Sequence, residues 1–159
     1  MTLSKRARQF QQTLDERGLG LTVQELPDST RTADDAARAL GCSKAQIVKS
    51  LVFRAAATGA PVVVLASGPN QVDLDTVAER IGGGIEKADA DFVKSATGYA
   101  IGGVPPLGHK EPVTVLVDED LRTFDEVWAA AGTPNAVFKI PGKITEILPE
   151  HTVLKVKRG

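Results

Sequence analysis

The sequence has few of the residues that covalent cross-links and metal sites require. It contains one cysteine, Cys42, and two histidines, His109 and His151, among 159 residues. A single cysteine cannot form an internal disulfide, and the sequence has no CxxC, HxxxH or HExxH spacing for zinc. No GxGxxG segment opens a helix, so the dinucleotide-binding fingerprint is absent too. We therefore expect no metal and no cofactor.

Long hydrophobic runs are also missing. The longest apolar stretches, such as Pro61–Ala66, fall far short of the ~20 residues that a membrane helix needs. The first residues, Met1–Arg8, are polar and basic and have no apolar signal core. We expect a cytoplasmic protein that does not bind membranes.

An excess of one charge is absent, because the formal net charge is −1. Proteins that coat nucleic acid regardless of sequence draw their affinity from many phosphate contacts, so this balance argues against such a coat, and no DNA partner is expected. Two small basic clusters lie near the chain ends: Lys5, Arg6 and Arg8, and Lys155, Lys157 and Arg158. We interpret them as solvated chain ends in preference to phosphate-binding groups.

Hydrophobic residues make up 42% of the chain and charged residues 25%, which is typical of a globular domain. No repeat, low-complexity tract or long linker divides residues 1–159, so one domain is expected. Hydrophobic spacing, caps and turn residues predict the following elements. Helices are expected at Ser4–Arg17, Thr32–Gly41, Lys44–Lys49, Asp73–Ile81, Asp89–Ser95, Phe124–Ala131 and Lys143–Leu148, and strands at Leu21–Leu26, Ser50–Ala55, Pro61–Ser67, Thr97–Ile101, Val113–Val117, Ala136–Ile140 and Val153–Val156.

These elements alternate irregularly, and both hairpin and crossover connections are expected between them. That order favours an α/β fold in which a mixed, curved or barrel-like sheet is flanked by helices, over a regular doubly wound sheet.

The loop Gly102–His109 is the most informative segment. Its glycines allow a backbone to approach a ligand closely, and its two prolines fix φ. A phosphate-binding P-loop is excluded, because Pro105 and Pro106 have no N–H donor. Two interpretations stay open: the amides of Gly102, Gly103 and Val104 face one carbonyl or oxyanion, or the loop is a rigid structural turn.

Other candidates each have a structural alternative. Lys49 contacts a ligand or is simply solvated, and His109 is an acid/base group or else a surface or hydrogen-bonded residue. The segment Thr133-Pro134-Asn135 lines a pocket or only turns the chain. The run Asp118–Asp120 is interpreted as a helix cap, and Trp128 as part of a helical core.

Three segments together resemble the YbaK and prolyl-tRNA-synthetase-associated editing family, and most closely its free-standing ProX-like members. They are Gln46–Phe53, Asn70–Leu74 and Gly98–His109. The resemblance extends over nearly the whole chain, from the first helix to the last strand. It implies the mixed α/β fold of that family and a protein that acts in trans.

The implied activity is hydrolysis of the ester that joins a wrong amino acid to the 3′ adenosine of a tRNA, without a metal. By position, Lys49 matches the family lysine associated with the aminoacyl-adenosine end, and Gly102 with Pro106 matches its GxxxP loop, which would hold the substrate carbonyl. The resemblance implies water as nucleophile, assisted by the ribose hydroxyl of the substrate. His109 stands where many members have another residue, so its role stays open.

The resemblance predicts a small amino acid such as alanine on tRNA-Pro, with cysteine, serine and threonine as alternatives. The partners would be misacylated tRNA and, as a further expectation, an aminoacyl-tRNA synthetase. Catalysis is expected from Lys49, Gly102, Gly103 and Pro106, and substrate binding from Val104, His109, Thr133, Pro134 and Asn135. The alternative function is a non-catalytic module that binds tRNA ends or nucleotides.

Overall fold

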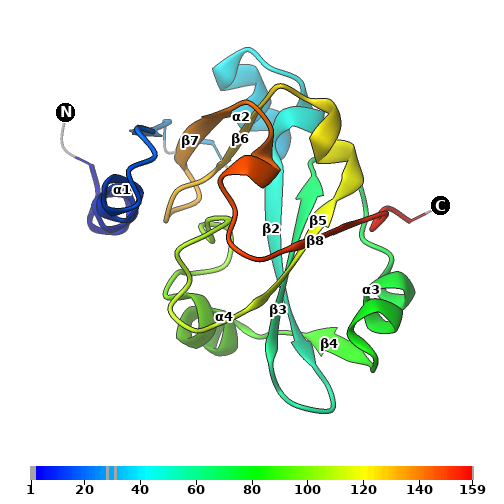
Figure 1. Cartoon of the computed structure of the whole chain (residues 1–159). Helices are drawn as coiled ribbons and strands as arrows, with labels where there is room; N and C mark the ends of the chain where they lie inside the picture. Colours follow the sequence, from blue (N-terminus) through cyan, green and yellow to red (C-terminus); the bar gives the residue numbers. More distant parts are fainter. Residues whose placement is uncertain (1–2, 28, 31, 159) are drawn as a thin grey trace.

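The computed structural model describes residues 3–27, 29–30 and 32–158, and two β-sheets form its centre (Figure 1). The larger sheet has the order β4 (Ile85–Lys87), β2 (Val48–Ala55), β3 (Pro61–Ser67), β5 (Thr114–Asp118) and β8 (Thr152–Leu154). The smaller sheet has the order β1 (Val23–Glu25), β7 (Ala136–Pro141) and β6 (Glu126–Ala130). Because β2 is antiparallel to β3 and β4, while β3, β5 and β8 run parallel, the predicted mixed sheet is confirmed.

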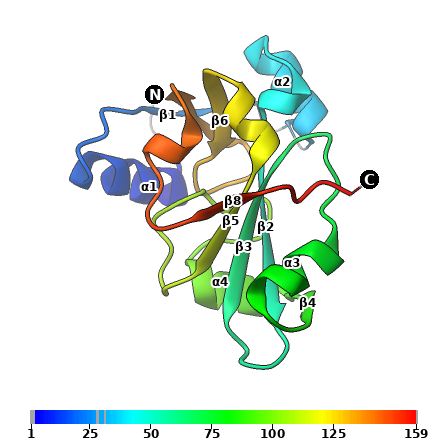
Figure 2. The same cartoon turned by 45° about the vertical axis from the view of Figure 1, so that its right-hand side comes forward.

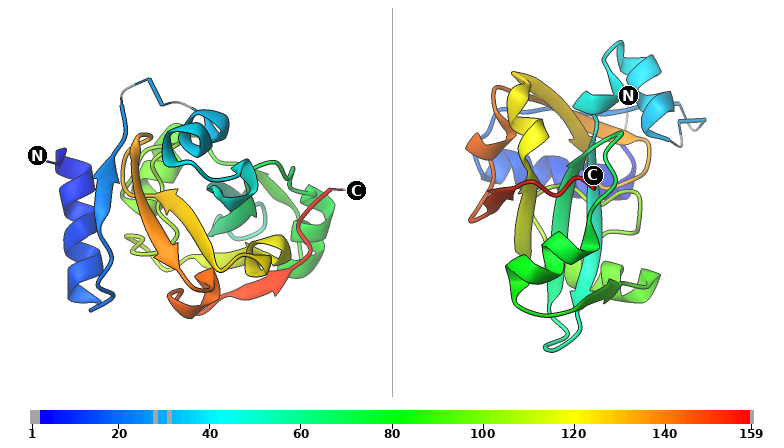
Figure 3. Two further views of the ribbon diagram at one scale, coloured as in Figure 1. Left: turned by 90° about the horizontal axis from the view of Figure 1, so that it is seen from above. Right: turned by 90° about the vertical axis from the view of Figure 1, so that its right-hand side faces the viewer.

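Helices cover both faces and the edges of these sheets. They are α1 (Lys5–Glu16), α2 (Ala33–Leu40), α3 (Leu74–Ile81) and α4 (Ala90–Thr97), with 3₁₀ turns η1 (Lys44–Gln46), η2 (Glu119–Thr123) and η3 (Ile144–Glu146). The helix α1 lies beside the smaller sheet, at the opposite end of the molecule from α3 (Figure 3). Figure 2 shows α3 and α4 near the end of the large sheet where β4 lies. None of the described helices is long and apolar enough to cross a membrane.

Local sequence signals explain where these helices begin and end. Thr32 and Asp35 form the predicted capping box of α2, and Gly41 ends that helix with φ of 69°. Asp73 caps α3 by accepting hydrogen bonds from the next turn.

The hydrophobic core has a large part between the sheets and smaller parts under α2 and α3. In the large part, the ring of Phe10 from α1 lies 5.0 Å from the ring of Phe138 in β7. On the other face of the large sheet, Val77 of α3 packs over Val62 and Val64. The strand β2 also has core contacts on both faces, because Val52 packs against the large part and Phe53 against the part under α3, and this fixes the position of the residues along it.

The predicted helix at Phe124–Ala131 is wrong. The 3₁₀ turn η2 ends at Thr123, before this segment, and the segment itself contains the strand β6, in which Val127 and Ala129 are buried and their neighbours are half-buried. Burial every second residue is the period of a strand, and pairing with β7 overrides the helix preference of the alanines. Trp128 consequently lies half-buried on a strand.

The predicted strand at Thr97–Ile101 is also wrong, because Thr97 is the last residue of α4 and Gly98 ends that helix with φ of 85°. The helices predicted at Lys44–Lys49 and Lys143–Leu148 are single 3₁₀ turns. As a result, β2 begins at Val48 and Lys49 lies within the strand. The short strand β4 was not predicted from the sequence.

Candidate functional site

A largely apolar pocket of about 360 Å³ lies at the start of β2. Its walls come from β2, from α2, from β6 and β7, and from the loop that follows α4. An isolated parallel bridge between Ile47 and Trp128 joins the two sheets beside it. Among the residues that line it, the polar side chains are those of Thr32, Lys49 and Ser50.

Lys49 is half-buried in the wall of this pocket. Its Nζ donates a hydrogen bond of 2.7 Å to the backbone oxygen of Asn70. Burial lowers the pKa of Lys49, and the nearby Lys44 lowers it further, while Asp118 acts in the opposite direction. An ammonium group has three N–H donors, so two remain for a ligand.

Asn70 is itself fixed by a buried network. Its Nδ2 donates to one carboxylate oxygen of Asp118 and one of Asp120, each at 2.8 Å. Asp118 is fully buried and also accepts from the backbone N–H of Ser67 and of Asp120. The predicted capping role of this acidic run is thus present, since Asp118 caps the 3₁₀ turn η2. The carboxylates of Asp118 and Asp120 also fix Asn70, whose backbone oxygen accepts the hydrogen bond from Lys49.

Ser50 contributes a hydroxyl without a partner. Its Oγ is buried and forms no hydrogen bond with the described part of the chain. Ser67, by contrast, donates from Oγ to the backbone oxygen of Ala45 at 2.6 Å. A buried hydroxyl without a partner is unfavourable, so Ser50 lowers the stability of the fold.

The loop Gly102–His109 is divided between the pocket and the core. Gly102 is exposed, lines the pocket and has φ of 89°, and a Cβ there would lie 3.5 Å from Cγ of Pro134. Val104 lines the pocket as well, and neither amide donates a hydrogen bond to the described residues. Gly103 differs, because its N–H donates to the backbone oxygen of Ala100 at 3.0 Å.

Gly103 and Pro106 are buried behind the pocket wall. A Cβ on Gly103 would lie 2.7 Å from Cα of Thr133, so only glycine fits there. Pro105 and Pro106 are both buried, and Nε2 of His109 donates to the backbone oxygen of Pro105 at 2.8 Å. His109 does not line the pocket; burial lowers its pKa more than the bond to Pro105 raises it. Gly103, Pro106 and His109 therefore fix the loop from the side that faces away from the pocket.

The segment Thr133-Pro134-Asn135 both turns the chain and borders the pocket. Pro134 lines the pocket opposite Gly102. Thr133 accepts from the N–H of Ala136 through Oγ1, and Asn135 donates from Nδ2 to the backbone oxygen of Leu26. Thr133 and Asn135 therefore stabilise the turn that presents Pro134.

Sequence reasoning missed several pocket residues. Ser50 could have been found, because it directly follows Lys49 and residues 48–53 of this strand all line the pocket. Trp128 and Ala36 could not, because their place depends on how β6 and α2 pack against β2.

The pocket can bind and orient a ligand, but its lining offers few side chains for covalent catalysis. It combines the ammonium group of Lys49 with the amides of Gly102 and Val104, which have no partner among the described residues. In apolar surroundings, these groups interact strongly with a polar bond of a ligand. Cys42 lies outside it, and burial raises the pKa of its thiol. No group of three or more metal-ligating side chains was found in the described ranges 3–27, 29–30 and 32–158.

Several known proteins resemble this chain over most of its length. Residues 27–146 match the model of the aminoacyl-tRNA editing domain. A solved structure of a candidate trans-editing enzyme for prolyl-tRNA synthetase is similar, with a TM-score of 0.92 and 45% identity over 99% of this chain and 100% of that one. The uncharacterized Bacillus subtilis protein YwhH is 30% identical over 76% of each chain. The candidate Cys-tRNA(Pro)/Cys-tRNA(Cys) deacylase EbsC of Enterococcus faecalis is 30% identical over 64% of this chain and 62% of its own.

Proposed function

This chain belongs to the aminoacyl-tRNA editing family, and from that membership we propose that it deacylates, in trans, a tRNA-Pro that carries a small wrong amino acid. The observation that carries the proposal is the meeting of Lys49 and Gly102 in one apolar pocket, although 53 positions separate them in the sequence. A structural turn and a solvated lysine would have no reason to meet there.

In the proposed complex, the 3′ adenosine and its aminoacyl group enter this pocket. Lys49, held by Asn70, directs its two remaining N–H donors at the terminal nucleotide. The amides of Gly102 and Val104 face the ester carbonyl, where negative charge develops during attack. His109, Gly103 and Pro106 hold the loop in place.

The reaction is addition of water to the ester carbonyl, followed by cleavage of the bond to the ribose oxygen. The proton of the water passes to the leaving ribose oxygen, so the products are the free amino acid and a tRNA with a free hydroxyl. We assign no side chain of the pocket as nucleophile and no metal to the step. Orientation and fixed dipoles supply the acceleration for this activated ester.

Selection among amino acids would depend on the apolar part of the pocket. A difference of one methylene in such a pocket is worth about 1 to 3 kcal/mol, or about 10- to 200-fold in rate. We expect alanine to be removed best, with cysteine, serine and threonine as the competing substrates, and correctly attached proline to be spared.

The test is a panel of tRNA-Pro species charged with alanine, cysteine, serine, threonine or proline, incubated with purified protein. Hydrolysis of at least one small aminoacyl ester, with proline retained, supports the proposal. If every ester decays at the rate of the protein-free control, the protein is not a deacylase of these substrates. Adding prolyl-tRNA synthetase to the same reactions tests whether it is a partner.

A further inference from the structure

A second, polar pocket of about 590 Å³ is bordered by the same two segments as the first, α4 and the loop that follows it, through different residues of each. On α4, Val93 faces the first pocket, whereas Asp91 and Lys94 line the second. In the following loop, Gly102 lines the first pocket, and Gly98, Gly108 and Lys110 line the second. The remaining wall comes from Arg6 and Gln9 of α1.

The charges of this second pocket are unbalanced. Three cations, Arg6, Lys94 and Lys110, line it together with one carboxylate, Asp91. None of the three cations takes part in an ion pair within the described part of the chain. The whole chain has a formal net charge of −1, so this local excess is not a general property of the surface.

Helix stabilisation explains only part of the charge. Lys94 and Lys110 lie near the C-terminal end of α4, where cations are favourable. Arg6 lies in the first turn of α1, where the helix dipole disfavours a cation. Its guanidinium is nevertheless held by a hydrogen bond of 2.8 Å to Oε1 of Gln9, which leaves its other N–H groups available.

We propose that this pocket binds a phosphate group of the single-stranded 3′ end of the tRNA while the terminal adenosine occupies the first pocket. The inference rests on the proposed function. An arginine fork beside two lysines suits phosphate oxygens, and α4 and the loop that follows it border both pockets, as the binding of one continuous RNA strand requires. The phosphate contact adds affinity for RNA and leaves the chemistry at the ester unchanged.

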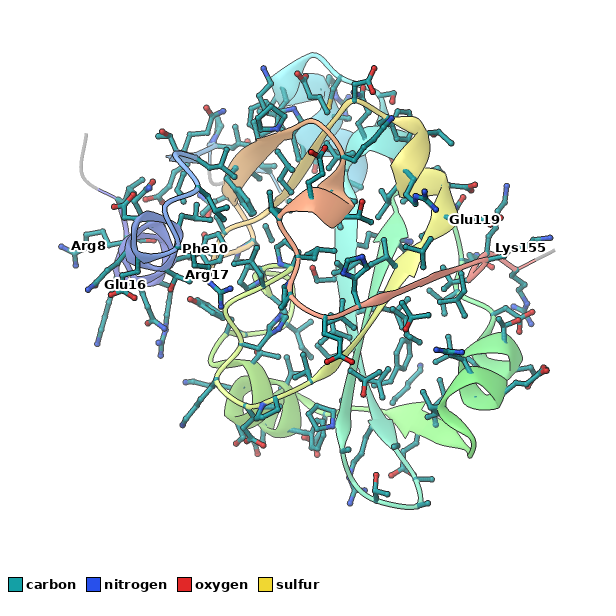
Figure 4. All side chains as sticks on the ribbon, viewed as in Figure 1. Arg8, Phe10, Glu16, Arg17, Glu119 and Lys155 are labelled. Atoms are coloured by element: carbon teal, nitrogen blue, oxygen red, sulfur yellow. The ribbon has the colours of Figure 1, made fainter. Side chains whose placement is uncertain are left out.

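The experiment compares two double variants. Lys94→Ala/Lys110→Ala removes two charges from the second pocket. Lys5→Ala/Arg8→Ala removes two charges from α1 outside both pockets, and Arg8 points away from the body of the protein (Figure 4). Each is assayed with misacylated tRNA-Pro and with 3′-alanyl-adenosine, which has no phosphate, over a series of salt concentrations. Thermal melts confirm folding.

We expect the pocket double variant to lose about tenfold or more in kcat/KM on tRNA and to keep its rate on alanyl-adenosine within about twofold. The slope of log(kcat/KM) on tRNA against log salt concentration should become less steep by about one to two in this variant. The α1 double variant should stay within about twofold of wild type on both substrates.

Three results would overturn the inference: equal losses on both substrates, equal losses in both double variants, or an unchanged salt slope. If wild-type protein hydrolyses neither ester, the proposed function fails. A measurement of RNA binding then tests the phosphate site independently of hydrolysis. A fluorescent RNA oligonucleotide with a free 3′ CCA end should bind wild type more tightly than the pocket double variant. Binding of inorganic phosphate without binding of this RNA would mean that the pocket is a simple anion site.

Discussion

Nζ of Lys49 lies 2.7 Å from the backbone oxygen of Asn70, 21 positions further along the chain. Because Asn70 is fixed by the buried carboxylate of Asp118, the lysine is positioned before any substrate arrives. Preorganisation of this kind lowers the entropy lost on binding.

Replacing Lys49 with alanine should leave the protein folded and lower deacylation at least about tenfold. A charged contact to the terminal nucleotide is worth about 1.4 kcal/mol or more, which corresponds to that factor. Single-turnover hydrolysis measures the loss, and Lys87→Ala, an exposed lysine of β4, is the matched control. Wild-type rate and wild-type melting temperature in Lys49→Ala would refute the assignment.

The two glycines of the loop should respond differently to alanine. Gly102→Ala adds a methyl group to the pocket wall and strains a residue with φ of 89°, so it should cost about two to three decades of rate and a few degrees of Tm. Gly103→Ala places a Cβ 2.7 Å from the backbone of Thr133 and should mainly destabilise the fold. Melting curves and rates of both variants separate the effects. A fully active Gly102→Ala would contradict the backbone role.

Ser50→Ala should raise the melting temperature. The change removes a buried hydroxyl that has no partner in the described part of the chain, which relieves about 1 to 3 kcal/mol; each kcal/mol is about 2 to 4 °C for a chain of this size. Ser67→Ala is the control, because its hydroxyl is bonded to Ala45 and its loss should lower Tm. A lower Tm for Ser50→Ala would mean that the hydroxyl is structural.

His109 should make the protein less stable in acid. Burial lowers the pKa of His109 in the folded state, so the unfolded chain binds a proton more readily. The stability contributed by neutral His109 is therefore complete above the unfolded pKa of about 6.5 and is lost as the pH falls below it. Melts of wild type and His109→Gln at pH 8 and pH 5 measure this, because glutamine still donates to Pro105 without titrating.

Activity provides a second test of the same residue. His109→Ala should reduce the rate about tenfold or less, since His109 lies behind the pocket wall and contacts Pro105. If His109→Ala abolished turnover while Gly102→Ala remained active, histidine general-base catalysis would replace the preorganised-backbone mechanism.

Local signals in the sequence predicted most elements correctly. The helices α2 and α3 lie where expected, because the signals that start them at Thr32 and Asp73 and end them at Gly41 and Gly82 depend on neighbouring residues only. The strand β6 could not be predicted in this way, because its alanines prefer a helix and only pairing with β7 makes it extended.

The candidate site shows the same division. Local chemistry in the sequence singled out Lys49, Gly102, Val104 and Pro134, and the fold brings these residues together in one pocket. The place of His109 behind the loop, and the partner that holds Lys49, depend on contacts between residues far apart in the sequence.

Gly132 has an evolutionary consequence. A Cβ at this position would lie 2.6 Å from the backbone oxygen of Arg6, and its N–H donates to the backbone oxygen of Gly103. The backbone of α1 is therefore packed directly against Gly132, the residue that donates a hydrogen bond to the loop Gly102–His109. A descendant of this chain can acquire a side chain at position 132 only if its first helix has moved or been lost, so these two features should be inherited together.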